Sequence, residues 1–262
     1  MAGQSEGGVD APRPRFLFGE PEEAAFRDPV EGAQALVDWG RGWQMGLRVQ
    51  ARRALRRVLP LPREEDTLDD LAIQSAKTAV VLPGVWERWE VLETWARGLS
   101  AFGWNVRMVP SLDLQIGTLT ELADRLSQFL EEEELSDVLV VAHSKGGLVT
   151  KQAMAGTQGW RIGRLIACGT PFDGAPIANL TVPQLKMRSL VPWDPEIQIL
   201  SDNHEPNLRI VAIQAQWDQN VPPDPALPGA TVVTVTVEGH NALLTAPEVV
   251  ALIAHYAGSG TR

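Results

Sequence analysis

The chain has 262 residues, which is enough for one large domain with a substantial core and requires no second domain. Hydrophobic residues make up 44% and charged residues 21%, the balance of an ordinary globular protein, and no apolar run is long enough to span a bilayer. The formal net charge of −10 argues against general binding to nucleic acid.

The single cysteine, Cys168, lies in an apolar run and cannot form an internal disulfide, so we expect it to pack in the core. The first thirty residues hold no apolar segment of the signal-peptide type. These two features together predict a cytoplasmic protein.

The N-terminal part of the chain divides into two predicted segments. Residues 1–28 are rich in glycine, proline and acidic residues, which predicts a flexible segment. Residues 29–77 predict a helical arm and an acidic linker, with the helix running from about Val30 to Leu59. Apolar side chains recur in it at spacings of three and four and form one apolar face: Trp39, Trp43, Leu47, Ala51, Ala54 and Val58.

The other face of this helix is unusually basic. Residues 41–63 contain seven arginines and no acid: Arg41, Arg48, Arg52, Arg53, Arg56, Arg57 and Arg63. A basic amphipathic helix with tryptophans can lie on an anionic membrane surface, so peripheral membrane contact through residues 30–60 is one hypothesis. We favour the other, a helix packed on the main domain with its arginines solvated or paired to the acidic cluster Glu64, Glu65, Asp66, Asp69 and Asp70.

The main domain is predicted to span residues 78–262. Short apolar runs predict strands at 78–82, 105–109, from Val138 up to Ser144, and at 162–168, 208–215 and 231–237. Amphipathic patterns predict helices at 87–102, 118–133 and 247–256. Strands that alternate with helices predict an α/β fold with a parallel sheet covered on both faces.

One long segment breaks this alternation. Between Gly169 and Asn207, proline recurs at positions 171, 176, 183, 192, 195 and 206, and no strand pattern is present. Such an insertion in a compact α/β domain usually covers a functional site. We therefore predict a lid over residues 172–207.

The most informative motif follows the strand that starts at Val138. Ala142-His143-Ser144-Lys145-Gly146-Gly147 places a serine between small residues, where the chain turns from a strand into a helix. This matches the small-x-Ser-x-Gly nucleophile elbow, whose tight turn tolerates little side-chain volume. The alternative is a Ser-Gly helix start without any chemistry.

A serine nucleophile needs a base to take its proton and a carboxylate to orient the base. His240 follows the last apolar strand, where a loop at the carboxyl end of a parallel strand would place it, and we prefer it to His143, His204 and His255. Asp218 is the first carboxylate after the preceding strand, although an aspartate there can also simply form a turn. The weaker candidates are Asp224 and then Asp173.

Hydrolysis also needs two hydrogen-bond donors for the oxyanion that develops on the substrate. The backbone N–H of Lys145, directly after the serine, is one candidate. The other is the N–H of Val85, in the loop after the first main strand, where Gly84 allows a close approach of the backbone.

Residues 78–257 resemble the serine hydrolases of the α/β-hydrolase fold, in the bacterial lipase and esterase branch. The matching segments are Leu82-Pro83-Gly84, the elbow, Gly169-Thr170-Pro171, Asp218 through Pro222, and Gly239-His240. The resemblance implies a doubly wound, mostly parallel sheet of about six strands, with Ser144, Asp218 and His240 as the triad and Val85 and Lys145 as the oxyanion donors.

The sequence departs from this family at two positions. Pro83 stands where the oxyanion turn usually has histidine, and Lys145 stands where a neutral residue is more usual. A cation at a helix start is disfavoured by the helix dipole. We expect Lys145 to pair with a nearby acid; the alternative is that it biases the site towards anionic substrates.

The resemblance implies hydrolysis of carboxylic esters with no metal or cofactor, on a small ester or lipid-like substrate. Trp86, Phe172 and Leu185 are predicted to line an acyl pocket, with Trp89, Leu180, Leu190, Val191 and Trp193 as further candidates, and packing of the lid against the core is the alternative for each. A thioesterase or acyltransferase would use the same triad. A binding protein without catalysis on a hydrolase scaffold is the alternative of another class.

Overall fold

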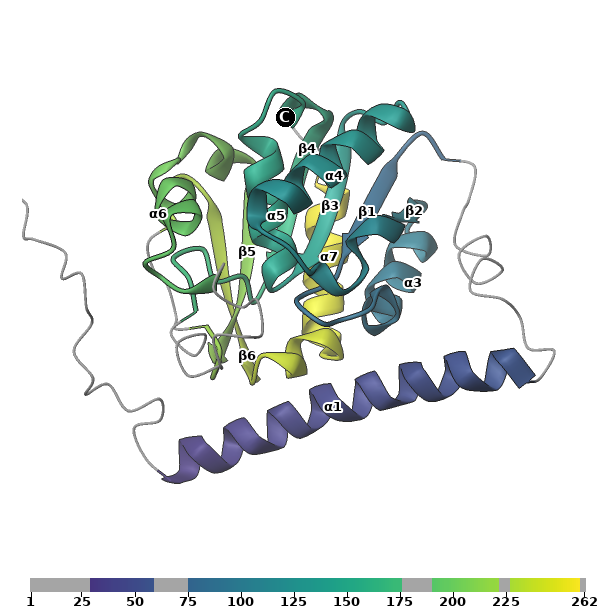
Figure 1. The fold of residues 1–262 in the computed structure, drawn as a ribbon, viewed down its shortest axis with the longest axis vertical. Helices are drawn as coiled ribbons and strands as arrows, with labels where there is room; N and C mark the ends of the chain where they lie inside the picture. Colours follow the sequence, from purple (N-terminus) through teal and green to yellow (C-terminus); the bar gives the residue numbers. More distant parts are fainter. Residues whose placement is uncertain (1–28, 59–74, 176–189, 222–226, 260–262) are drawn as a thin grey trace, which may run out of the picture.

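The computed structural model describes residues 29–58, 75–175, 190–221 and 227–259. Its centre is a six-stranded parallel sheet with the strand order β2-β1-β3-β4-β5-β6 (Figure 1). The strands are β1 (Thr78–Leu82), β2 (Asn105–Met108), β3 (Val138–His143), β4 (Ile162–Cys168), β5 (Ile210–Trp217) and β6 (Thr231–Glu238). The predicted α/β class and the parallel sheet of about six strands are confirmed.

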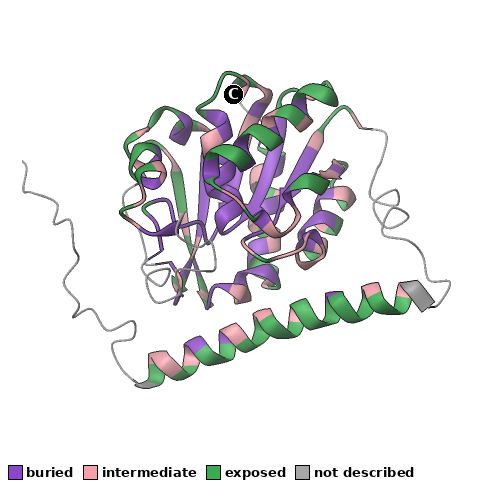
Figure 2. Cartoon of the chain, in the orientation of Figure 1, coloured by how far each residue is buried: buried purple, intermediate pink, exposed green. Residues whose placement is uncertain are grey.

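Helices cover both faces of the sheet, as predicted. The helices α4 (Leu119–Glu132) and α5 (Lys145–Met154) lie on one face, and α3 (Glu93–Ala101) and α7 (Pro247–Gly258) lie on the other (Figure 1). Successive strand residues point to opposite faces, so Val80 and Val140 pack beneath α4 and α5, and Val81 and Val141 pack beneath α3 and α7. This double cover explains why β3 is apolar throughout, and Figure 2 shows its burial.

The start of the predicted helix at 87–102 differs from the prediction. The chain first forms a 3₁₀ turn, η1 (Trp89–Leu92), and α3 begins only at Glu93. Two carboxylates divert this segment: Glu87 accepts a hydrogen bond from the backbone N–H of Gly84, and Asp113 accepts one from that of Trp89. The prediction at 118–133 was closer, because the Thr118 side chain caps α4 in a capping box with Glu121.

The predicted N-terminal helix is present as α1 (Pro29–Val58), a long helix that crosses one end of the sheet (Figure 1). It contacts η1 and the 3₁₀ turn η8 (Asn241–Leu244), both of which follow the carboxyl ends of strands. Arg52 and Arg53 pair with Glu93 and Glu90. The acidic cluster at 64–70, which was expected to pair with the arginines, lies outside the described residues.

The helix α1 leaves most of its predicted apolar face pointing outward; of the residues predicted for that face, Trp39 contacts the main domain through the Asn220 side chain. Ala35, Asp38 and Val49 are buried against the main domain, whereas Trp43 and Leu47 remain 76% and 65% exposed. In Figure 2 the outward side of the helix is coloured as exposed along most of its length. Polar contacts, described below, hold the inward side.

The described part of the predicted lid contains α6 (Pro195–Asp202) and the 3₁₀ turn η7 (Glu205–Arg209). The carboxylate of Glu196 accepts hydrogen bonds from the backbone N–H groups of Leu119 and Thr120, which fixes α6 to the start of α4. Residues 176–189, with Leu180 and Leu185, lie outside the described ranges, and the role of a lid stays a prediction. So do the domain boundaries.

Cys168 is fully buried at the end of β4, as predicted, and its burial raises the pKa of its thiol. In the described ranges, every helix falls short of the length and apolar character that crossing a bilayer requires.

Candidate active site

Ser144 occupies the turn between β3 and α5. Its backbone has φ 51° and ψ −123°, a conformation that residues other than glycine rarely adopt. Two hydrogen bonds hold this turn: the N–H of Ser144 donates to the carbonyl of Cys168 at 2.9 Å, and the Thr170 hydroxyl donates to the carbonyl of Ser144 at 2.9 Å. The Gly-Thr-Pro segment therefore supports the turn directly from the end of β4.

Close backbone approaches explain the glycines around this serine. A Cβ atom at Gly146 would lie 2.7 Å from the carbonyl oxygen of Pro83, and one at Gly84 would lie 3.0 Å from the Cβ of Ser144. The loop after β1 thus packs directly on the turn. Among the described residues, neither the N–H of Val85 nor that of Lys145 has a hydrogen-bond partner, so both remain available as donors next to Ser144.

Asp218 and His240 meet at the same edge of the sheet. Asp218 follows β5 and His240 follows β6, and Oδ2 of Asp218 lies 2.7 Å from Nδ1 of His240, with each side chain only 5% exposed. The other oxygen of Asp218 accepts hydrogen bonds from the N–H groups of Asn220 and Val221, which fixes the carboxylate. A Cβ atom at Gly169 would lie 3.2 Å from Nδ1 of His240, so the imidazole packs on Gly169. The preceding residue, Cys168, accepts the hydrogen bond from the N–H of Ser144.

The surroundings of His240 favour its protonated form. Burial by itself lowers the pKa of the imidazole, but the Asp218 carboxylate, through its charge and its hydrogen bond, opposes this effect, and the charges of Glu87 and Asp38 add to the opposition. The net result is a pKa raised above the ordinary histidine value. His240 is consequently a stronger base than a solvent-exposed histidine.

Glu87 and His143 form a largely buried pair behind the site. The sequence pointed to no role for Glu87, and His143 was considered there only as a rejected candidate for the base. Oε2 of Glu87 accepts from the N–H of Gly84 at 2.6 Å and lies 2.9 Å from Nδ1 of His143. Nε2 of His143 lies 3.3 Å from the carbonyl oxygen of His240, and the two imidazole rings are 4.7 Å apart. Burial raises the pKa of Glu87, but His143, the N–H of Gly84 and His240 together lower it overall. Glu87 and His143 therefore link the loop after β1 to the backbone of His240.

A second residue that the sequence analysis missed comes from α1. The Asp38 carboxylate is 1% exposed and accepts hydrogen bonds from Nε2 of Gln219 at 2.6 Å, from the N–H of Asn241 at 2.8 Å and from the N–H of Ala242 at 2.9 Å. Gln219 in turn accepts from the N–H of His240 at 3.2 Å. Asp38 thus ties together the loops that hold Asp218 and His240.

The expectation that Lys145 pairs with an acid is wrong. Its buried ammonium group donates to the backbone carbonyls of Gln115, at 3.1 Å, and Gly117, at 2.7 Å. Burial lowers the pKa of Lys145 to about 8, with partial compensation from the more distant charges of Glu196, Glu121 and Asp194. These two carbonyls hold the ammonium group in the loop that precedes α4.

The predicted pocket residues fall into different environments. Trp86 is 47% exposed beside Gly84 and Val85, and its backbone is held in a left-handed conformation by a hydrogen bond to the carbonyl of Leu114. Phe172 is 2% exposed and packs in the core. Trp89, Leu190 and Val191 are also buried, whereas Trp193 is exposed. The alternative of packing against the core thus holds for most of them, and Leu185 lies outside the described ranges.

The remaining candidates for acid and base lie elsewhere. Asp224 is outside the described residues, and Asp173 is exposed and accepts a hydrogen bond from Ser201. His204 and His255 are exposed, and His255 packs on Tyr256 within α7.

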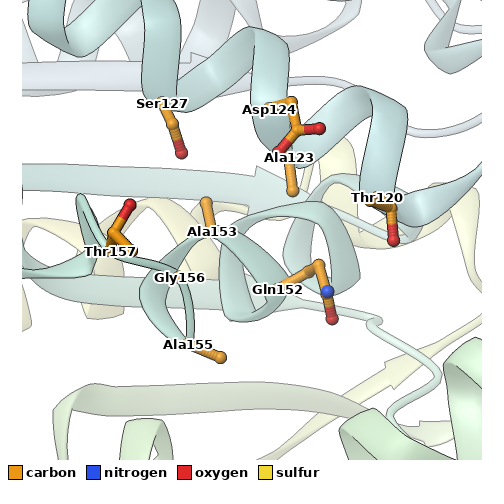
Figure 3. A pocket seen from close by; sticks show the side chains of 9 residues that line it. All are labelled: Thr120, Ala123, Asp124, Ser127, Gln152, Ala153, Ala155, Gly156 and Thr157. Atoms are coloured by element: carbon orange, nitrogen blue, oxygen red, sulfur yellow. The ribbon is translucent and has the colours of Figure 1, made fainter.

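The described residues offer no cluster of three or more histidine, cysteine, aspartate or glutamate side chains suited to a metal ion. A cavity of about 160 Å³ lies between α4 and the second half of α5 (Figure 3). Short side chains such as Ala123, Ser127 and Ala153 line it, and none of the predicted site residues takes part. We therefore separate this cavity from the site.

The sequence matches no family model and no curated protein. Solved structures are similar in fold. A mature lipase from Bacillus licheniformis superposes with a TM-score of 0.56 at 15% identity, covering 71% of this chain and 94% of the lipase. A monoacylglycerol lipase from Paleococcus ferrophilus superposes with a TM-score of 0.55 at 12% identity, covering 71% of this chain and 95% of the lipase. A hydrolase from Oleispira antarctica superposes with a TM-score of 0.52 at 14% identity, covering 74% of this chain and 98% of the hydrolase. The chain therefore has the α/β-hydrolase fold, as predicted.

Proposed function

We propose that this chain is a serine hydrolase that cleaves carboxylic esters through an acyl-enzyme. The observation that carries the proposal is the buried 2.7 Å contact between Asp218 and His240, at the same end of the parallel sheet as a serine in the strained turn of a nucleophile elbow. Few structural roles require a carboxylate, an imidazole and a hydroxyl together at the end of three parallel strands. The similarity in fold to lipases from two other organisms supports the choice of esters.

In the proposed reaction, Oγ of Ser144 attacks the ester carbonyl while Nε2 of His240 takes the hydroxyl proton. Asp218 holds the imidazole through Nδ1 and stabilises the imidazolium. The N–H groups of Val85 and Lys145 donate to the oxyanion of the tetrahedral intermediate, and neither N–H has another partner among the described residues. His240 then protonates the leaving alcohol.

The second half of the reaction uses the same groups with water as the nucleophile. His240 takes a proton from water, the resulting hydroxide attacks the acyl-enzyme, and the ester bond to Ser144 breaks as its oxygen recovers the proton. The chemistry needs no metal or cofactor. An alcohol or amine that replaced water would make the same site an acyltransferase, and a thioester substrate would make it a thioesterase.

Reaction with a fluorophosphonate probe tests the proposal at its centre. We expect the full chain to form one covalent adduct, the Ser144→Ala variant to form none, and Ser127→Ala to react like the wild type because Ser127 lies in α4 away from the site. An unlabelled wild-type protein that is folded by circular dichroism would falsify the enzyme proposal and favour a binding protein.

The substrate class requires a separate measurement. Hydrolysis rates for p-nitrophenyl esters from acetyl to palmitoyl, together with a thioester series, compare acyl-chain length and leaving group at the same serine. We expect the wild type to hydrolyse oxygen esters, and we expect Ser144→Ala to be inactive on the same substrates. Turnover of thioesters alone, or only with added alcohol, would move the assignment to a thioesterase or an acyltransferase.

A further inference from the structure

The outward face of α1 is apolar over most of the helix. Leu36, Val37, Trp43, Leu47 and Leu55 are between 49% and 76% exposed. At 100° per residue, Leu36, Trp43 and Leu47 project from one side of the helix, opposite the buried Ala35, Asp38 and Val49. A helix of 30 residues is about 45 Å long, so the apolar area of this face is far larger than that of a single exposed leucine.

Polar contacts fix the helix in this orientation. Asp38 is buried among donors from two loops, Trp39 donates to the Asn220 side chain at 3.1 Å, and Arg53 lies 2.6 Å from Glu90. Rotation of the helix about its axis would break these contacts and leave the Asp38 carboxylate without its donors. The apolar face is therefore a fixed part of the surface.

A row of arginines flanks the apolar face. Arg41, Arg48 and Arg52 follow one another at spacings of seven and four residues on one side of the helix, and all three are exposed. Arg41 lies 3.6 Å from Asp38 and Arg52 lies 3.1 Å from Glu93, whereas Arg48 has no carboxylate partner among the described residues. An apolar face containing tryptophan beside a basic flank matches a helix that lies in the headgroup region of an anionic bilayer. Two copies of this chain that met through the same faces would instead bring two such rows of positive charge together.

The position of α1 matters for the site. The helix contacts the loops after β1, β5 and β6, so it lies at the edge of the sheet where Ser144 and His240 are found (Figure 1). A surface bound by the outward face of α1 would lie beyond that edge.

We propose that the outward face of α1 binds the surface of a membrane that contains anionic lipid, with Trp43 and Leu47 in the headgroup region and Arg48 on the phosphates. This inference does not rest on the proposed ester hydrolysis, because its measurement is binding. The Ser144→Ala variant is expected to bind membranes as the wild type does, so failure of either proposal can be recognised separately.

Sedimentation of the full chain with vesicles tests the proposal. We expect binding to phosphatidylcholine vesicles that contain phosphatidylglycerol, and weaker binding to phosphatidylcholine alone or at high salt. Trp43→Glu should lower the partition coefficient at least about tenfold, since a charge replaces the anchoring ring. Trp160→Glu is the matched control and should change binding by less than about twofold. Trp160 is 63% exposed in the turn before β4, at the amino-terminal end of the strands and so at the opposite end of the sheet from α1.

A second pair of variants tests the charge. Arg48→Glu should weaken binding to the anionic vesicles by roughly tenfold, and Arg125→Glu, on the exposed side of α4, should not. Leu47→Glu replaces Trp43→Glu if circular dichroism shows that the latter is misfolded.

Several outcomes would overturn the proposal. They are no binding by the wild type, equal binding to neutral and anionic vesicles, or equal effects of Trp43→Glu and Trp160→Glu. A dimer in light scattering that Trp43→Glu dissociates, without vesicle binding, would assign the face to contact between copies of the chain.

Discussion

Asp38 provides the sharpest test of how the site is held. Its carboxylate lies on α1, yet it accepts hydrogen bonds from the loop that follows Asp218 and from the two residues that follow His240. The variant Asp38→Asn keeps the shape of the side chain but replaces one acceptor oxygen with an NH₂ group. That group would face donors, so at least one of the buried N–H groups loses its acceptor.

The expected loss of stability follows from these contacts. A buried donor left without a partner costs about 1–3 kcal/mol, and hydrogen bonds to a charged group contribute about 1.5–3 kcal/mol each without being additive. We expect Asp38→Asn to lower the free energy of unfolding by about 2–4 kcal/mol, which lowers the Tm of a chain of this size by roughly 5–12 °C. If α1 undocks instead, water solvates the donors, and the loss of stability cannot exceed the free energy with which α1 docks.

The pH dependence of the reaction gives a measurement that stability alone would not change. The Asp38 charge is one of the influences that raise the pKa of His240, and only the neutral imidazole can act as a base. Removal of that charge should shift the acidic limb of the kcat/KM profile to lower pH. Glu31→Gln, which removes a charge from the first turn of the same helix, should leave the limb in place.

Three measurements together can refute this reasoning. Tm comes from calorimetry, the acidic limb from the hydrolysis of a p-nitrophenyl ester, and undocking from limited proteolysis with trypsin at the arginines of α1. An Asp38→Asn variant with the Tm, acidic limb and tryptic resistance of the wild type would show that Asp38 has no positioning role.

Other contacts at the site give further predictions. Asp218→Asn should lower kcat on the order of 10³- to 10⁴-fold and shift the acidic limb, which in the wild type lies above the usual histidine pKa of about 6.5, to lower pH. Gly146→Ala should cost about 1–3 kcal/mol in urea unfolding because its Cβ would meet two backbone carbonyl oxygens, whereas Gly40→Ala, where nothing lies within 4 Å, should stabilise the protein slightly; equal effects would contradict the close approach. For Lys145, the lowered pKa of about 8 means that the unfolded chain binds more protons between pH 8 and about 10.4. The stability of the wild type relative to Lys145→Met should thus rise over that pH range, and a flat difference would show that burial imposes no such penalty.

The sequence was sufficient to predict those parts of the fold that depend on local pattern. The strand of Val138 to His143 is buried on both faces, so its apolar run needed no alternation to be recognised, and the small residues around Ser144 reflect contacts with the loop after β1. Asp218 and His240 could be chosen because each follows a strand of a parallel sheet, and such strand ends share one edge. Their mutual contact then follows from the adjacency of β5 and β6.

The supporting residues could not be found in this way. Glu87 and Asp38 act through contacts with segments 56 and 203 residues away in the chain, and no spacing rule connects them. Lys145 shows the same limitation, since an acid was expected to compensate its charge, whereas two backbone carbonyls from an irregular loop accept its hydrogen bonds. Backbone acceptors leave no trace in the side-chain pattern.

The orientation of α1 shows what periodicity alone leaves open. The spacing of its apolar residues predicted a helix with an apolar face, and the usual expectation is that such a face turns inward. Here the edge of the sheet that α1 covers presents polar groups, because loops end there with free N–H donors at Asn241 and Ala242 and with the amide of Gln219. A carboxylate satisfies these donors and an apolar side chain cannot, so the polar face docks and the apolar face is left for another surface. The same contact that positions the proposed base therefore also determines which side of α1 faces outward.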